Sequence, residues 1–290
     1  MKSTCEKAYA KLNISLDVPG KRSDGYHDML MIMQTVSLCD ELCVELCDKG
    51  RSSAQSNLPY IPDDERNLAV KAANLFFRAA DIKNVGARIT LTKNIPVCAG
   101  MGGGSADAAA VLRALNRLTG AGFDREELEK IARLAGSDVA FCVAGGTALA
   151  SGRGDELEDV PPVPDCAVVI CKPDFQISTP ELFKKLDSVK LRCHPDTRGI
   201  LTALECGDLG GMARRMYNVF EDVPDRRMGA ISAVKGRLLD CGAIGSVMTG
   251  TGSAVFGIFP DEASACAAAD ALRREYKFCC AARPVGRLEI

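Results

Sequence analysis

Apolar and polar residues alternate over residues 11–18, KLNISLDV. The apolar side chains share one face and the polar side chains share the other; the two sets are Leu12, Ile14, Leu16 and Val18, and Lys11, Asn13, Ser15 and Asp17. A repeat of two residues is typical of a strand with one face in the core and one face in solvent. We therefore expect a half-buried strand here, followed by a polar, glycine-containing loop over residues 20–30.

The same reasoning divides the rest of the chain into strands and helices. Short apolar or alternating runs predict strands at 41–46, 86–95, 167–173 and 278–285, and two more on either side of a glycine turn within 242–259. Apolar residues at helical spacing predict helices at 67–82, 105–118, 124–136, 178–186 and 261–276. In the strand at 86–95, Ile89 and Leu91 share a face, and Lys93 is a candidate third member of it.

These elements are interspersed without a regular succession of strand, helix and parallel strand. That order favours an α+β fold in two layers over a doubly wound parallel sheet. The segment 155–166, DELEDVPPVPDC, is acidic and rich in proline, and we take it as the main boundary. We expect one lobe over residues 1–155 and a smaller α+β lobe over residues 165–290.

Composition narrows the classes of protein that need to be considered. The formal net charge of the 290 residues is −2 and the pI is about 5.9, so the basic surface typical of nucleic-acid binding is not expected. No apolar run reaches the roughly 18 residues of a membrane-spanning helix, and the N-terminus lacks the apolar core of a signal peptide. We expect a cytoplasmic protein that is a monomer or weak homodimer, with neither a membrane nor a nucleic acid as partner.

Fourteen cysteines are scattered along the chain. No Cys-x-x-Cys pair occurs, and the tightest group, Cys39, Cys43 and Cys47, has no histidine near it in the sequence. A zinc site is therefore not favoured. We expect reduced thiols that serve mostly as small core residues.

The densest glycine cluster of the chain leads directly into a predicted helix, in residues 96–109, PVCAGMGGGSADAA. A Walker A loop needs a lysine after its last glycine, and Gly104 is followed by serine and alanine. The dinucleotide spacing Gly-x-Gly-x-x-Gly also fails, whether counted from Gly100 or from Gly102. A tight turn between strand and helix remains open, but four glycines in five residues exceed what a turn requires. We favour a phosphate-binding loop of another type, in which backbone N–H groups, the helix N-terminus and the Ser105 hydroxyl face an anion.

This segment resembles the phosphate-binding motif of the GHMP kinases, a family of small-molecule kinases. Three further segments resemble motifs of the same family, in the same order along the chain: residues 10–29, 136–155 and 248–257. The triple glycine with Asp107 is similar to the members whose substrate carries a cytidine diphosphate group and that act in the non-mevalonate route to isoprenoid precursors. One departure is visible, because the family usually has two serines after the glycines and this chain has Ala106 as the second residue.

The resemblance implies a fold and a reaction. The fold is the two-lobed GHMP-kinase fold, in which the N-terminal lobe is like the second domain of ribosomal protein S5 and the active-site cleft lies between the lobes. The reaction is transfer of phosphate from ATP, with Mg²⁺, to the 2-hydroxyl of the methylerythritol part of a cytidine-diphosphate substrate. A homoserine or mevalonate kinase, and a non-catalytic nucleotide-binding protein on the same fold, remain alternatives.

The resemblance also implies the site residues. Lys11 supplies the positive charge that the glycine loop lacks, and Asp138 is the catalytic aspartate; from sequence alone they could equally be a solvated edge lysine and a helix cap. ATP contacts are expected from Pro96, Val97, Cys98, Ala99, Gly100, Met101, Gly102, Gly103, Gly104, Ser105 and Ala106. Substrate contacts are expected from Asn13, Tyr26, His27, Thr179, Phe183, Gly250 and Gly252, with Tyr26 and Phe183 on either side of the cytosine.

Overall fold

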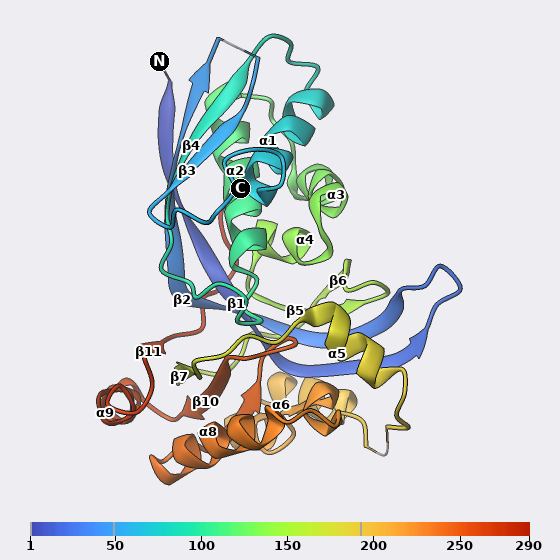
Figure 1. The fold of residues 1–290 in the computed structure, drawn as a ribbon, viewed down its shortest axis with the longest axis vertical. Helices are drawn as coiled ribbons and strands as arrows, with labels where there is room; N and C mark the ends of the chain where they lie inside the picture. The colour runs from blue at the N-terminus through green and yellow to red at the C-terminus, as the bar shows by residue number, and fades with distance from the viewer. Residues whose placement is uncertain (1, 49, 192) are drawn as a thin grey trace.

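Two sheets, each with its own helices, are arranged along the long axis of the molecule (Figure 1). The structure is a computed structural model, and it describes residues 2–48, 50–191 and 193–290. Among these residues, no helix is both long and apolar enough to cross a membrane. The expected α+β fold in two lobes is confirmed, and the following paragraphs describe the features that position the site.

The first sheet has the strand order β3-β4-β2-β1-β8, and β5 joins it through β2 and pairs with β6. Its bounds are β1 Ser3–Lys21, β2 His27–Cys47, β3 Ser53–Ser56, β4 Gly86–Thr92, β5 Thr147–Ser151, β6 Glu156–Asp159 and β8 Tyr217–Asn218. The antiparallel pair β1–β2 is a long hairpin whose register shifts at three places along β1. It runs from the first lobe to the edge of the second lobe (Figure 1).

Four helices lie on one side of this sheet: α1 Leu68–Ala79, α2 Gly103–Thr119, α3 Arg125–Ala135 and α4 Ser137–Ala144. Helix α2 is buried from Ala106 to Asn116, and it packs against β1, β2 and the other three helices. Its many alanines allow this close approach because they carry almost no side-chain volume. The predicted capping box of α3, Asp124 with Glu127, is confirmed, and so is the end of that helix at Gly136.

The second sheet is antiparallel, in the order β11-β7-β10-β9. Its strands are β7 Ala167–Lys172, β9 Gly245–Met248, β10 Val255–Phe259 and β11 Phe278–Ala282. The accompanying helices are α5 Thr179–Leu186, α6 Thr197–Glu205, α7 Leu209–Ala213, α8 Met228–Asp240 and α9 Glu262–Leu272, with a short 3₁₀ helix at Val219–Asp222. After β11 the chain returns to the first lobe, where the N–H groups of Val285 and Leu288 donate to the carbonyls of Thr35 and Ala144.

The expected half-buried strand at 11–18 is wrong, because β1 is buried on both faces there. Its polar face is covered by the turn after β9: the Asn13 N–H donates to Thr249 Oγ1, and the Gly250 N–H donates to Asn13 Oδ1. The loop expected at 20–30 is also shorter, because β1 extends to Lys21 and β2 begins at His27. A single alternating segment does not reveal that a distant turn will cover its polar side.

Three segments cross between the two sheets at or beyond the predicted boundary: β6, β8 and the tail after β11. Strand β6 lies in the segment taken as the boundary, where it pairs with β5. Strand β8 comes from the second half of the chain but pairs in parallel with β1 at Ser15 and Leu16. The lobes therefore share strands as well as a surface.

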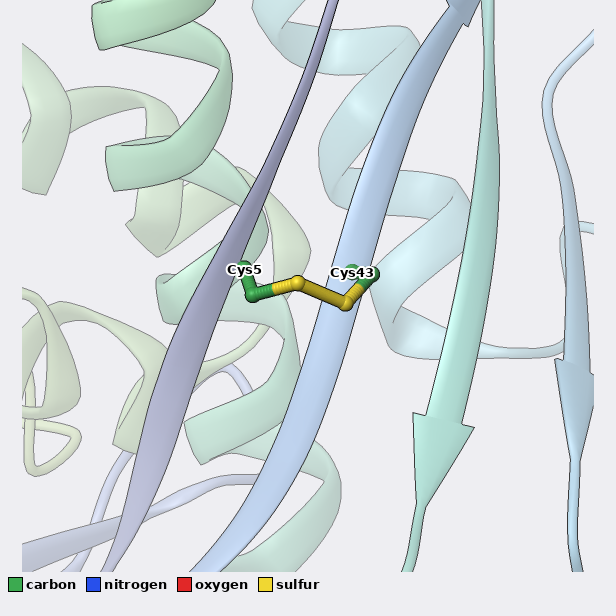
Figure 2. Close-up of a disulfide and its surroundings, with 2 residues drawn as sticks. All are labelled: Cys5 and Cys43. Carbon is green, nitrogen blue, oxygen red and sulfur yellow. A yellow bond between two sulfur atoms is a disulfide. The ribbon is translucent and has the colours of Figure 1, made fainter.

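Cys5 and Cys43 form a disulfide, which corrects the expectation of reduced thiols for these two residues (Figure 2). They are directly opposite each other in the β1–β2 register. Neither lies near the other in the sequence, so only the pairing of the strands brings the two sulfur atoms together. Of the twelve other cysteines, all free, only four are buried, Cys142, Cys166, Cys171 and Cys279, so the expected core role holds for a minority of them.

We predict that replacing Cys5 and Cys43 together by serine lowers the free energy of unfolding by about 2–4 kcal/mol, since the disulfide closes a loop of 38 residues in the unfolded chain. Urea denaturation without reductant measures this. The matched control replaces the exposed thiols Cys206 and Cys266 by serine and should leave the free energy of unfolding unchanged. Equal stability of the Cys5/Cys43 variant and the wild type would contradict the prediction.

Candidate active site

A cavity of about 970 Å³ lies between the lobes. It is lined by the tip of the β1–β2 hairpin, the glycine loop, the start of α4, α5 and the turn 250–252. A second cavity of about 530 Å³ adjoins it, and both are lined by Cys98, Gly100, Gly102 and Thr179. A third, of about 1010 Å³, is bounded by α1 and residues 50–53 and contains none of the predicted site residues.

Lys11 and Asp138 both line the larger cavity, and Lys11 lies beside Gly102, which lines both cavities: a Cβ on Gly102 would be 3.1 Å from Lys11 Cγ. Lys11 Nζ lies 3.5 Å from Asp138 Oδ2 and donates a hydrogen bond of 2.8 Å to Asn13 Oδ1. The lysine side chain is only 4% exposed, whereas that of Asp138 is 34% exposed. Asp138 is in the first turn of α4, where the helix N-terminus favours a negative charge. The structure thus brings together two residues that are 127 positions apart in the sequence, with the carboxylate open to the larger cavity.

Asn13 does not line either cavity, so the structure gives no support to the expected substrate contact. Its side chain is fully buried, and its Oδ1 accepts from Lys11, from the Gly250 N–H and from Thr249 Oγ1. Asn13 is therefore placed to hold the lysine ammonium and the turn at 249–250 in a fixed relation.

The glycine loop has backbone conformations that explain its composition. Gly100 and Gly102 have φ of +78° and +67°, in the region that favours glycine. A Cβ on Gly100 would lie 2.1 Å from the Thr249 carbonyl oxygen, so this residue must be glycine for the loop to meet the second lobe. Helix α2 begins at Gly103, which directs its free N–H groups toward the smaller cavity.

Most of the predicted ATP contacts line that smaller cavity, from Pro96 to Ser105. Ala106 is the exception, because its side chain is buried beneath the loop and faces neither cavity. Asn67 and Leu68, at the start of α1, lie on the opposite wall. The walls therefore combine helix N-termini and backbone N–H groups with apolar side chains, an environment that suits a nucleotide.

A buried cluster of three charged side chains lies behind the loop: Lys93 with Asp40 and Asp107. The Lys93 ammonium contacts both carboxylates, and Asp40 Oδ1 also accepts from the N–H groups of Asn94 and Ile95. Burial raises the pKa of Asp107 to about 7, against the lowering effect of Lys93. Asp107 Oδ1 has no hydrogen-bond partner among the described residues. The cluster joins β2, the segment before the loop and the N-terminal part of α2.

Sequence reasoning found Lys93 only as a candidate member of a buried face, and it missed Asp40. The signal was present in part, because a lysine on an otherwise apolar strand face needs carboxylate partners once it is buried. Which carboxylates meet it depends on strand pairing and on the position of α2, and neither can be read from local spacing.

Arg113 was not identified from the sequence either. It is 1% exposed, and burial lowers its pKa to about 10. Its guanidinium donates to the carbonyls of Cys142 and Val143, at the end of α4, and to the carbonyl of Lys7 in β1. It also pairs with Glu6. Arg113 therefore joins the helix that carries Asp138 to the strand that carries Lys11.

The predicted substrate residues of the larger cavity come from three elements. His27 Nε2 lies 2.6 Å from Asp187 Oδ1, and the His27 ring is 4.7 Å from the ring of Phe183. Tyr26 is 54% exposed, and the guanidinium of Arg153 lies 3.7 Å from the centre of its ring. All three aromatic residues line the cavity, together with Arg153, which sequence reasoning missed.

Thr179, Gly250 and Gly252 also line the larger cavity. The Thr179 hydroxyl is 2.8 Å from that of Thr251, which links the start of α5 to the turn 250–252. Gly250 and Gly252 both have positive φ, and a Cβ on Gly250 would lie 2.8 Å from the Gly100 carbonyl oxygen. The two glycine turns are therefore packed against each other at the centre of the site.

We predict that Asp107→Asn changes how the stability depends on pH. The folded pKa of Asp107 is about 7, above the ordinary carboxyl value near 4, so the folded protein keeps a proton that the unfolded chain releases. The free energy of unfolding should therefore fall as the pH rises from about 4 to about 7 in the wild type, and less steeply in the variant. Urea denaturation across this range measures both slopes. Asp165→Asn, at an exposed position, is the control, and equal slopes for wild type and Asp107→Asn would contradict the prediction.

Comparison with known proteins agrees with this geometry. The sequence profile described as the GHMP kinases N terminal domain matches residues 67–146, and that of the GHMP kinases C terminal domain matches residues 200–277. A 4-diphosphocytidyl-2-C-methyl-D-erythritol kinase of Clostridium botulinum (strain Eklund 17B / Type B) is 45% identical over 88% of this chain and 90% of its own length. One of Acetivibrio thermocellus is 41% identical over 94% of this chain and 96% of its own.

Solved structures show the same relationship. A crystal structure of 4-(cytidine 5'-diphospho)-2C-methyl-D-erythritol kinase superimposes with a TM-score of 0.81 at 34% identity, and the match covers 98% of this chain and 100% of that one. A homoserine kinase from Cytophaga hutchinsonii has a TM-score of 0.78 at 20% identity, with 99% and 96% covered, which shows a shared fold. The chain therefore belongs to the GHMP kinases, as an ATP-dependent small-molecule kinase of the group formed by the 4-diphosphocytidyl-2-C-methyl-D-erythritol kinases.

Proposed function

We propose that this kinase transfers the terminal phosphate of ATP to the 2-hydroxyl of 4-diphosphocytidyl-2-C-methyl-D-erythritol. The observation that carries the proposal is the Lys11–Asp138 pair in the wall of the cavity with the aromatic side chains, directly beside the glycine loop that also lines the adjoining cavity. Phosphoryl transfer to an alcohol requires a held triphosphate, an offset for the charge on the moving group and an oriented hydroxyl. Each requirement has a counterpart in this arrangement.

ATP is assigned to the smaller cavity. Its phosphates face the glycine loop and the N-terminus of α2, where backbone N–H groups and the Ser105 hydroxyl are available to donate. The buried cluster of Lys93, Asp40 and Asp107 supports this loop from behind, since Asp40 holds the backbone of Asn94 and Ile95. The loop is thereby held in place before the nucleotide arrives.

Mg²⁺ is expected to bind together with ATP. Magnesium in kinases is held by substrate phosphates, by water and by one or two protein oxygens, so a site made by protein side chains alone is not required. Among the described residues, no group of three or more histidine, cysteine or acidic side chains is placed to hold a metal ion. Ser105 and Asp107 both line the smaller cavity, so a hydroxyl oxygen and a carboxylate oxygen are available there to the ion. When bound, the ion would offset charge on the phosphates.

Asp138 is assigned the role of orienting the acceptor hydroxyl and taking its proton. The Lys11 ammonium, fixed by Asn13, offsets negative charge on the phosphoryl group as it moves between the cavities. Because Lys11 is nearly inaccessible and Asp138 faces the larger cavity, the acceptor approaches from the side of the carboxylate. Arg113 positions Lys11 and Asp138 indirectly, because its guanidinium donates to backbone carbonyls of the strand and the helix that carry them.

The cytosine is assigned to the aromatic end of the larger cavity, near Tyr26, His27 and Phe183. The exposed ring of Tyr26 and the partly exposed ring of Phe183 suit a flat, polar base, which binds by stacking and by hydrogen bonds at its edge. The diphosphate then extends toward the turn 250–252, where the glycines allow close approach of the backbone. Homoserine and mevalonate carry no base, so this aromatic end would have no role in kinases for them.

We predict that Asp138→Asn lowers kcat by about 10²–10⁴-fold, the usual range for loss of a general base. Isothermal titration calorimetry should show unchanged ADP affinity, because Asp138 lies on the acceptor side. A coupled assay for ADP release measures turnover. If the variant kept more than about a tenth of the wild-type kcat, Asp138 would not be the base.

The acceptor is tested by comparing substrates and by Tyr26→Ala. The wild type should turn over the cytidine-diphosphate substrate but not homoserine or mevalonate, and methylerythritol phosphate only poorly. Loss of one base–aromatic stack, worth about 1–3 kcal/mol, should raise the KM for the cytidine substrate roughly 5- to 150-fold in Tyr26→Ala and leave the KM for ATP unchanged. Equal kcat/KM of the wild type for the cytidine substrate and methylerythritol phosphate would overturn the assignment.

A further inference from the structure

The basic side chains that line the larger cavity differ in whether a carboxylate of the protein pairs with them. Lys11 pairs with Asp138, His27 with Asp187, and Arg227 with Asp225. Arg153 also lines the cavity, but within the described part of the chain it forms neither an ion pair nor a side-chain hydrogen bond. Its positive charge is therefore available to an anion that enters from solution.

The backbone around Arg153 is held in place although its side chain is exposed. Gly152 and Gly154, on either side, have φ of +62° and +89°. The Gly154 N–H donates to the Ser151 carbonyl, and the Met29 N–H donates to the Gly152 carbonyl at 2.7 Å. These bonds tie the turn between β5 and β6 to the start of β2, so the arginine is presented at one place on the cavity wall while its side chain is free to change rotamer.

The Arg153 guanidinium lies over the ring of Tyr26, 3.7 Å from its centre. Because both residues line the cavity, we take the covered face to be the one that the proposed function assigns to the cytosine. The guanidinium and a base cannot both occupy that face. A cation over an exposed aromatic ring is held weakly, whereas a guanidinium pairs with a phosphate through two charge-assisted hydrogen bonds.

We propose that Arg153 is a specificity-determining residue that binds the diphosphate of the acceptor and leaves the ring of Tyr26 in doing so. The inference rests on the proposed function, since it concerns the same substrate. The base and the diphosphate belong to one molecule. When it binds, the diphosphate pairs with Arg153, and the base takes the position on the Tyr26 ring that the guanidinium has left. A nucleoside without phosphate must displace the arginine from the ring but cannot form an ion pair with it.

The test is a ligand series measured by isothermal titration calorimetry: cytidine, CMP and CDP, with saturating ADP present to fill the smaller cavity. The wild type should bind CDP more tightly than cytidine, because only CDP carries the anion. In Arg153→Gln the ratio of the two affinities should shrink by about 10-fold or more, as expected for loss of a hydrogen-bonded charge pair. Cytidine itself should bind Arg153→Gln as well as the wild type or better, because the face of Tyr26 is no longer covered by a cation.

The matched control is Arg22→Gln. Arg22 lies in the turn of the β1–β2 hairpin, which also carries Tyr26. It is paired with Asp24 and Asp28, and it does not line the cavity. This variant has the same net charge as Arg153→Gln and should keep the wild-type ratio. Arg153→Lys keeps the positive charge but cannot form the bidentate hydrogen bond of a guanidinium, so it should restore the ratio of CDP to cytidine affinity only in part.

The possible failures are distinguishable. If the wild type binds none of the three ligands, the proposed function itself is wrong and the role of Arg153 falls with it. If the wild type binds all three but Arg153→Gln leaves the ratio of CDP to cytidine affinity unchanged, or weakens both ligands equally, the proposed function stands and the role of Arg153 is overturned. If Arg22→Gln lowered the ratio of CDP to cytidine affinity as much as Arg153→Gln, the effect would come from the net positive charge near the cavity. That result would also overturn the role of Arg153.

Discussion

A lysine ammonium buried between two lobes is the constraint on which the rest of this structure depends. An unpaired charge at such a place would be costly, so partners must converge on it. Asn13 and Asp138 do so from β1 and α4, and Asn13 also holds the turn at Gly250. Arg113 in turn fastens α4 to β1. The same contacts that neutralise one charge therefore set the distance between the lobes and the position of the carboxylate in the cleft.

Much of the site could be anticipated from the sequence because its parts lie in short segments with distinct compositions. The glycine loop, the aspartate after Gly136 and the aromatic pair at 26–27 each stand out locally, and the structure places them around adjoining cavities. The residues that were missed act across long distances. Asp40 and Arg113 have no local signature, and Arg153 lies in the recognised segment 136–155 but without a sign of its role; the roles of all three depend on which strand or helix packs against them.

The errors in the fold have a related cause. Alternation predicted β1 correctly as a strand but not its burial on both faces, since the cover comes from residues more than 230 positions later. The Cys5–Cys43 pair likewise follows from the register of two strands rather than from cysteine spacing. Most helices have start and stop signals of their own, such as the capping box of α3, and these were predicted well.

The connections between the lobes have a mechanical consequence. The hairpin β1–β2 reaches from one lobe to the other, β8 returns to β1, and the tail after β11 bonds to β2 and α4. Two lobes connected at several separate places cannot rotate about a single hinge. Access to the cleft must then depend on side chains at its rim, such as those of Tyr26 and Arg153, rather than on rotation of one lobe against the other.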